Sequence, residues 1–251
     1  MEKNNYIVNC NFGSGVFSRF TLGIQELIRH PLDNLNQVYF DYQDTFNYVF
    51  DQSLPSPAKV IYTHKDISAY NDNGFLPVND KPLINQIVNK LKIHPDIKVN
   101  PQITDRTLGI HIRLTDLMTA DIRYNNNPYT TEDIIESTYN IMESGDYDNI
   151  FIASDNTESL EKFDKKFNFI HNNSQFIYHQ EVDPTRDSDY LWLERFETPQ
   201  EETKAFVQEA FLDMYSLSKC GGLMRIGSNL AVASLMFSNT INKIYGYKYS
   251  N

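Results

Sequence analysis

Residues 108–114 read LGIHIRL, and they are followed by TTEDIIESTYNIME at 130–143, NIFIAS at 149–154 and TESLEKFDKKF at 157–167. The first and third segments are short, apolar and rich in isoleucine, which is typical of buried strands. The second and fourth carry apolar residues at helical spacing. Strands that alternate with helices in this way predict an α/β fold with a parallel sheet.

The same alternation extends toward both ends of the chain. YIVNC at 6–10 precedes VFSRFTLGIQELIRH at 16–30. After the central stretch come QFIYH at 175–179, TKAFVQEAFLDMYSLSK at 203–219, GGLMRIG at 221–227, SNLAVASLMF at 228–237 and NKIYGY at 242–247. Phe206, Ala210, Met214 and Leu217 recur at helical spacing, so we expect the long helix to cover the sheet with this face.

Prolines and asparagines interrupt the pattern between the first strand–helix unit and Leu108. The segments SLPSPAKV (53–60), NDNGFLPVNDKP (71–82) and KIHPDIKVNPQ (92–102) carry most of these interruptions. We therefore expect a domain boundary near Asn100, with an N-terminal domain over 1–100 and a C-terminal domain over 101–251.

The composition and net charge argue against some classes of function. The 251 residues are 41% hydrophobic and 22% charged, which are ordinary values for a globular protein. A formal net charge of -11 and the lack of any Lys/Arg run argue against nucleic-acid binding. Neither a long apolar leader nor a membrane-spanning run is present in the sequence, which favours a cytoplasmic protein. Cys10 and Cys220 have no partner at a metal or redox spacing and are expected to be buried free thiols.

Three predicted strands of the C-terminal half end in polar residues. The residues are His111, Arg113, Thr115 and Asp116 after the first strand, Ser154, Asp155 and Asn156 after the second, and Arg225, Gly227, Ser228 and Asn229 after the third. Ligands of open parallel sheets bind at the carboxyl ends of the strands. These residues are therefore the candidates for a binding site.

Arg113 is the strongest candidate for contact with a phosphate. His111, Arg113 and Thr115 alternate along the strand and share one face. A guanidinium presents a planar fork of donors that matches phosphate oxygens and stays charged. The alternative is an ion pair of Arg113 with Asp116. Because the other two strand ends are also polar, the pattern favours contact of Arg113 with phosphate over the ion pair.

For each of the other two strand ends, a ligand-binding role and a purely structural role are both possible. Gly227 and Ser228 lie between a strand and a helix, where Ser228 caps the helix and the free N–H groups attract an anion. A pure capping role is the alternative, although the two roles are compatible. Asp155 or Asn156 could contact a nucleobase, since the adjacent N–H donors of guanine suit a carboxylate. The alternative is that one of them only caps the next helix.

The glycines of NFGSG, Gly13 and Gly15, also lie between a strand and a helix. The segment lacks the complete GxGxxG pattern of dinucleotide-binding proteins, so alone it is weak evidence for phosphate binding. The alternative is a tight turn that only requires glycine.

Three segments, in this order, resemble the α-1,6-fucosyltransferase and protein O-fucosyltransferase superfamily: GIHIRLTDLMTAD (109–121), NIFIASDNTESLEKF (149–163) and AFLDMYSLSKCGGLMRIGSNLAVASLMF (210–237). The resemblance covers about Thr107 to Phe237. It implies a GT-B fold, which has two Rossmann-like parallel-sheet domains, here with a small N-terminal domain. It also implies an inverting fucosyltransferase that takes GDP-fucose as donor and a glycan as acceptor. By this resemblance the C-terminal domain (101–251) would bind the nucleotide sugar, and the N-terminal domain (1–100) would be the acceptor side.

Carried over to this sequence, the resemblance implies a role for each candidate. Arg113 would hold the diphosphate, His111 and the Asp155–Asn156 pair would face guanine, Ser228 and Asn229 would line the phosphate side, and Gly13 to Gly15 would approach from the opposite domain. Asp121 matches the position of an acidic residue proposed as base in core-fucosylating relatives, with a solvated loop carboxylate as the alternative. Asp116 would orient Arg113. No metal or other cofactor is expected, because Arg113 and the helix after Ser228 supply positive charge.

Three departures from the family pattern keep other functions open. Leu114 replaces a second arginine, Asn156 replaces the second residue of an aspartate pair, and the N-terminal domain is short. The same scaffold could therefore use a rhamnosyl or xylosyl donor, and a noncatalytic nucleotide- or carbohydrate-binding protein is a further alternative. The family's N-glycan acceptor does not carry over, and the sequence sets no oligomeric state.

Overall fold

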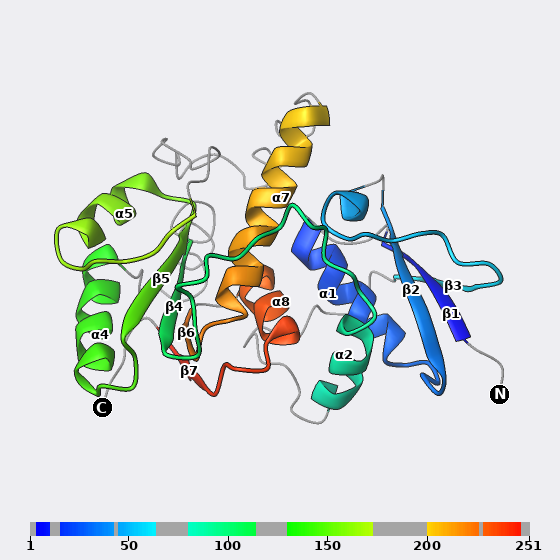
Figure 1. Cartoon of the computed structure of the whole chain (residues 1–251), viewed down its shortest axis with the longest axis horizontal. Helices are drawn as coiled ribbons and strands as arrows, with labels where there is room; N and C mark the ends of the chain where they lie inside the picture. Colours follow the sequence, from blue (N-terminus) through cyan, green and yellow to red (C-terminus); the bar gives the residue numbers. More distant parts are fainter. Residues whose placement is uncertain are drawn as a thin grey trace. The chain divides into compact units, whose positions relative to one another are not determined.

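The computed structural model describes residues 4–10, 16–42, 45–63, 80–113, 130–172, 200–225 and 228–246. The chain forms two compact units (Figure 1). Unit 1 consists of Met1–Lys98, Gln200–Leu212 and Gly227–Phe237, and unit 2 of Val99–Pro199, Asp213–Ile226 and Ser238–Asn251. Each unit has its own parallel sheet, which confirms the α/β class with parallel sheets.

The sheet of unit 1 contains β1 (Asn4–Asn9), β2 (Leu35–Asp41) and β3 (Lys59–Tyr62) in the order β2-β1-β3. The helix α1 (Val16–Leu27) packs on one face of this sheet. Gly23 makes the close approach possible, since a Cβ atom there would lie 2.9 Å from the Phe40 ring and 3.1 Å from Val8. Cys10 lies in the same contact and is a buried free thiol, and burial raises its pKa.

The core of unit 1 is aromatic. It is built by α1 and β2 together with η1 (Thr45–Tyr48), α2 (Lys81–Val88), α8 (Asn229–Phe237) and the first part of α7 (Gln200–Leu217). Its ring cluster comprises Phe20, Phe40, Phe46, Phe50, Phe211 and Phe237. Lys81 fixes the end of α8, because its Nζ donates to the carbonyl oxygens of Leu235 and Met236. Burial lowers the pKa of Lys81.

The sheet of unit 2 contains β4 (Thr107–Ile112), β5 (Asn149–Ser154), β6 (Gly222–Met224) and β7 (Lys243–Tyr245) in the order β5-β4-β6-β7. Helices α4 (Thr131–Glu143) and α5 (Thr157–Asp164) supply apolar side chains to one face of the sheet. On this face Ile110 and Ile112 pack in a cluster with Ile134 and Phe163. The prediction of both helices from sequence periodicity is thus confirmed.

The end of α7 covers the opposite face of this sheet. A Cβ atom at Gly109 would lie 3.0 Å from both Leu217 and the Cys220 sulfur, so only glycine allows this packing. Cys220 is the second buried free thiol, as expected. Along α7 the buried residues are Val207, Phe211, Met214, Ser216 and Leu217. The predicted face is therefore confirmed at Met214 and Leu217 but lies one residue later in the first turns.

The units do not follow a single cut in the sequence. Residues 200–212 and 227–237 pack with the first 98 residues although they come late in the sequence. Periodicity identifies which face of a helix is apolar but not which sheet receives it. Within the described ranges, no helix is long and apolar enough to cross a membrane.

Candidate functional site

Strand pairing in unit 2 brings the predicted strand ends together. Ile110 pairs with Met224, and Ile112 pairs with Ser154. When the register is continued, Arg225 follows beside His111 and Asp155 follows beside Arg113. Because β5 and β6 lie on opposite sides of β4, the sheet has its topological switch point between β4 and β6, which is where open α/β sheets bind ligands.

His111 and Arg225 are buried at this edge, with 4% and 6% of their surface exposed. His111 lies on the same strand face as Gly109, the face covered by the end of α7. The backbone N–H of Arg225 donates to the Tyr245 carbonyl at 3.0 Å, which holds the residue at the sheet edge. Arg225, one of the strand-end candidates from the sequence, is thus a buried residue of this edge.

Asn156 caps α5, as one of the two alternatives predicted. Its Oδ1 accepts from the backbone N–H of Ser159 at 2.8 Å, and its own N–H donates to the Ser154 hydroxyl at 3.1 Å. The cap is Asn156 and not Asp155. The carbonyl oxygen of the Asn156 amide is thus used in the helix, which leaves Asp155 as the better candidate for contact with a nucleobase.

Ser228 and Asn229 belong to unit 1, whereas His111, Arg113 and Asp155 belong to unit 2. The Ser228 Oγ accepts from the backbone N–H of Ala231 at 3.2 Å, which confirms the predicted N-cap of α8. The Thr21 hydroxyl of α1 donates to Asn229 Oδ1 at 3.3 Å. Local geometry at this helix end therefore agrees with the sequence, but the helix itself packs with the N-terminal unit.

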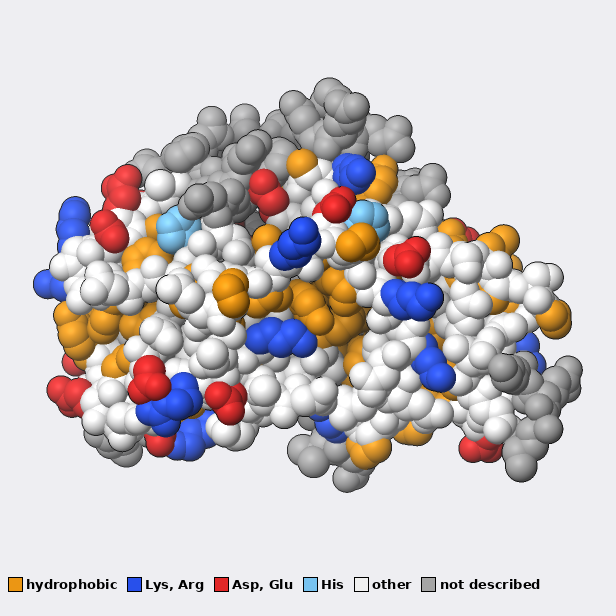
Figure 2. Space-filling view, viewed as in Figure 1, with side chains coloured by type: hydrophobic (Ala, Val, Ile, Leu, Met, Phe, Trp, Pro, Cys, Tyr) orange, Lys and Arg blue, Asp and Glu red, His pale blue; other side chains and the backbone are white. Residues whose placement is uncertain are grey.

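Six of the predicted site residues lie outside the described residues: Gly13, Gly15, Thr115, Asp116, Asp121 and Gly227. Their roles stay predictions. In the described part of the chain, no group of three or more His, Cys, Asp or Glu residues could hold a metal ion. On the face shown in Figure 2, basic side chains alternate with acidic ones and form no continuous patch.

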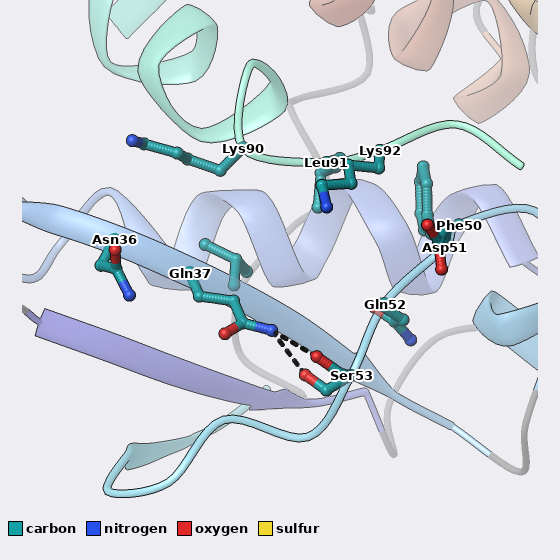
Figure 3. Close-up of a pocket in the computed structure, with 10 residues that line it drawn as sticks. Asn36, Gln37, Phe50, Asp51, Gln52, Ser53, Lys90, Leu91 and Lys92 are labelled. Atoms are coloured by element: carbon teal, nitrogen blue, oxygen red, sulfur yellow. Dashed lines mark hydrogen bonds between the residues drawn. The ribbon is translucent and has the colours of Figure 1, made fainter.

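A separate cleft of about 270 Å³ lies in unit 1 along the outer edge of β2 (Figure 3). It is lined by Asn36, Gln37, Val38, Phe50, Asp51, Gln52, Ser53, Lys90, Leu91 and Lys92, none of which is a candidate from the sequence. Gln37 donates to the carbonyl and hydroxyl oxygens of Ser53. The Gln52 amide bonds both backbone groups of Phe40, as a neighbouring strand would. The side-chain amides of Gln37 and Gln52 therefore stabilise the fold.

No known family model and no curated protein sequence matches the chain. Solved structures, by contrast, match this chain in fold. NodZ α-1,6-fucosyltransferase, co-crystallised with GDP, superposes with a TM-score of 0.51 at 10% identity over 95% of this chain and 93% of that chain. Fucosyltransferase NodZ from Bradyrhizobium gives 0.51 at 10% identity, over 95% and 94%. POFUT1 in complex with GDP gives 0.47 at 9% identity, over 99% of both chains.

The likeness extends over nearly the whole chain and includes both units, although sequence identity is very low. At this identity it bears on the fold and not on the reaction. It agrees with the superfamily that the three sequence segments resemble. The chain has the fold of the fucosyltransferase NodZ.

Proposed function

We propose that the protein is an inverting glycosyltransferase that transfers fucose from GDP-fucose to a glycan without a metal ion. The observation that carries the proposal is the polar edge of the unit 2 sheet. There Arg113, Asp155 and the buried side chains of His111 and Arg225 follow strands that pair next to the switch point. A site with two guanidinium groups suits a diphosphate.

The donor would be held by complementary groups at this edge. Arg113 binds diphosphate oxygens through its fork of N–H donors, and Arg225 adds positive charge from the neighbouring strand. The Asp155 carboxylate accepts from the adjacent N–H donors of guanine, with His111 and Asn156 nearby. The neighbour NodZ was crystallised with GDP, and another NodZ crystal was soaked with GDP-fucose. Those ligands support a guanine nucleotide as the first to test.

The remaining assignments come from the sequence. Ser228 and Asn229 line the phosphate side together with Gly227, and Gly13 and Gly15 approach the donor. In an inverting transfer a base removes the proton of the acceptor hydroxyl while the leaving diphosphate gains charge. Asp121 is the proposed base, and Asp116 orients Arg113. Arginine side chains and a helix N-terminus supply the positive charge that a metal ion supplies in other transferases.

Binding of nucleotides tests the donor. We expect GDP to raise the melting temperature more than UDP, CDP or dTDP at equal concentration, because a ligand stabilises the state it binds. The ranking should not change with EDTA. An equal response to all four nucleotides would contradict guanine recognition.

Turnover tests the enzyme class. GDP release from GDP-fucose, followed with and without acceptor sugars, separates a transferase or donor hydrolase from a protein that only binds. Strict dependence on Mn²⁺ or Mg²⁺ would contradict the proposed mechanism. Nucleotide binding without any turnover would indicate a noncatalytic nucleotide-binding protein.

A further inference from the structure

The two outer strands of the unit 1 sheet differ in how their backbone groups are used. On the outer side of β2, the side-chain amide of Gln52 bonds both the N–H and the C=O of Phe40. This amide occupies the place of a further strand at that position. In the described part of the chain, β1 is the only strand that pairs with β3. The outer edge of β3 is therefore the one to consider for pairing with another chain.

The hydrogen bonds between β1 and β3 show which backbone groups of β3 point outward. The Thr63 N–H donates to the Asn9 carbonyl at 3.1 Å, and Asn9 pairs with Tyr62. The N–H and C=O of one strand residue point to the same side, and those of the next residue point to the other side. Ile61 and Thr63 thus point to β1, while Val60 and Tyr62 point outward. Among the described residues, no backbone group bonds to these outward groups.

Val60 and Tyr62 also carry the exposed side chains of this strand. Their side chains share one face of the strand, and the residues are 50% and 57% exposed. Ile61, which lies between them, is only 5% exposed. Exposed apolar side chains beside unpaired backbone groups are typical of an edge strand that can pair with another chain.

The edge is complementary to itself. When a second copy is placed antiparallel, with a two-fold axis at Ile61, Val60 of each copy lies opposite Tyr62 of the other. Both residues point their N–H and C=O outward, so each such pair exchanges both of its hydrogen bonds. A β-branched residue opposite an aromatic one is a favourable cross-strand pair. Lys59 lies opposite Thr63, so no like charges face each other across the edge.

We infer that β3 is an interface at which two copies of this chain pair edge to edge. The two three-stranded sheets then form one continuous sheet across a two-fold axis, and both copies use the same surface. One short strand from each copy is less than the interface of a stable dimer, so the dissociation constant is expected to be on the order of 10–100 μM. The pairing goes beyond the proposed function and uses none of the residues assigned to the donor.

Sedimentation velocity of the full chain, from about 1 to about 500 μM, tests the inference. We expect a monomer at the low end and a dimer at the high end. Each copy carries a net charge of -11, so the copies repel each other. Salt screens this repulsion, and raising it from about 0.05 to about 0.5 M should therefore strengthen the dimer. A monomer at every concentration, or a dimer that salt weakens, would overturn the inference.

Paired charges at positions 60 and 62 test the register. The double variant Val60→Lys with Tyr62→Lys should abolish the dimer, because like charges then lie opposite each other. The double variant Val60→Lys with Tyr62→Glu places opposite charges in both pairs. It should dimerise at low salt and dissociate as salt is raised, the reverse of wild type. Equal association of the two folded double variants would overturn the proposed pairing.

Ile244→Lys is the matched control, since Ile244 is 42% exposed on β7, the outer strand of the unit 2 sheet. This variant should dimerise like wild type, and loss of its dimer would place the interface in unit 2 and overturn the inference. Melting temperatures establish that each variant is folded. GDP affinity should be the same in all of them, because the interface and the proposed donor site have no residue in common.

Discussion

The carboxyl edges of the two parallel sheets carry different sets of polar side chains. The edge of unit 2 carries Arg113, Asp155 and the buried Arg225, whereas the edge of unit 1 carries Asp41 and the shielded amide oxygen of Asn9. Both edges lie at a switch point of their sheet. A net charge of -11 conceals this local difference. The contrast teaches that two parallel sheets of one chain can end in different sets of polar side chains at their switch points.

The amino edge of the unit 2 sheet shows what purely structural charges look like. Arg106 bonds both carboxylate oxygens of Asp148 and the Gly145 carbonyl, and Lys243 pairs with Asp146. These charges are exposed and bonded to one another. At the carboxyl edge, His111 and Arg225 are instead buried. Exposed ion pairs stabilise a fold little, which makes the amino edge a suitable source of control variants.

The largest expected effect concerns the base, and it tests which edge supplies it. Asp121→Asn should reduce kcat by about 10²–10⁴ and leave GDP affinity unchanged, because the amide keeps the shape but cannot take a proton. Steady-state kinetics with GDP-fucose and an acceptor sugar measure this. If Asp41→Asn, and not Asp121→Asn, lowers kcat at saturating acceptor, the base comes from unit 1 and the assignment of Asp121 is wrong.

The next largest effect concerns Arg113, at the carboxyl edge of the unit 2 sheet. Arg113→Ala should weaken GDP binding about 10- to 100-fold, and Arg113→Lys should recover only part of this loss, because a point charge replaces a bidentate fork. Isothermal titration calorimetry measures both affinities. Arg106→Ala, at the amino edge of the same strand, should bind GDP like wild type. Normal GDP binding by folded Arg113→Ala would remove the phosphate site from this edge.

Two helix caps of unit 2 offer a matched comparison of a structural and a binding role. Thr130 caps α4 and Asn156 caps α5, each by accepting a backbone N–H. Alanine at either position should lower the free energy of unfolding by about 1 kcal/mol in urea denaturation. Only Asn156→Ala should also weaken GDP binding, by about severalfold. Equal GDP affinity in both variants would restrict Asn156 to its capping role.

The smallest effect is a pH dependence at the amino edge. The hydrogen bond from Arg106 holds the pKa of Asp148 below its ordinary value of 3.8. A carboxyl with a lowered pKa in the folded state stabilises the fold above its ordinary pKa, and this contribution is lost as the pH falls through the lowered value. Asp148→Asn should therefore reduce the melting temperature slightly at pH 6, and this difference should shrink as the pH is lowered below 3.8. Because the pair is exposed, 1 M salt should remove most of the difference.

Local patterns were sufficient for much of the fold and part of the site. Alternation of apolar segments determined the strands and helices from β4 to α5, since a period of 2 or 3.6 residues is a property of contiguous sequence. Ser228 was recognised as a cap because it stands directly before an apolar helix. The strand-end positions of Arg113, Asp155 and Arg225 followed from the same pattern and from the rule for parallel sheets.

The tertiary structure decided which segments meet. No local sequence pattern indicates that α8 and the first part of α7 pack with the first 98 residues, because an apolar helix face fits either sheet. Residues 9, 41 and 62 become neighbours at the carboxyl edge of the unit 1 sheet only through strand order and register. Burial of His111 and Arg225 likewise depends on elements distant in sequence. The sequence by itself determined the elements and the ends of strands where ligands bind, and only non-local packing decided which side chains share each edge.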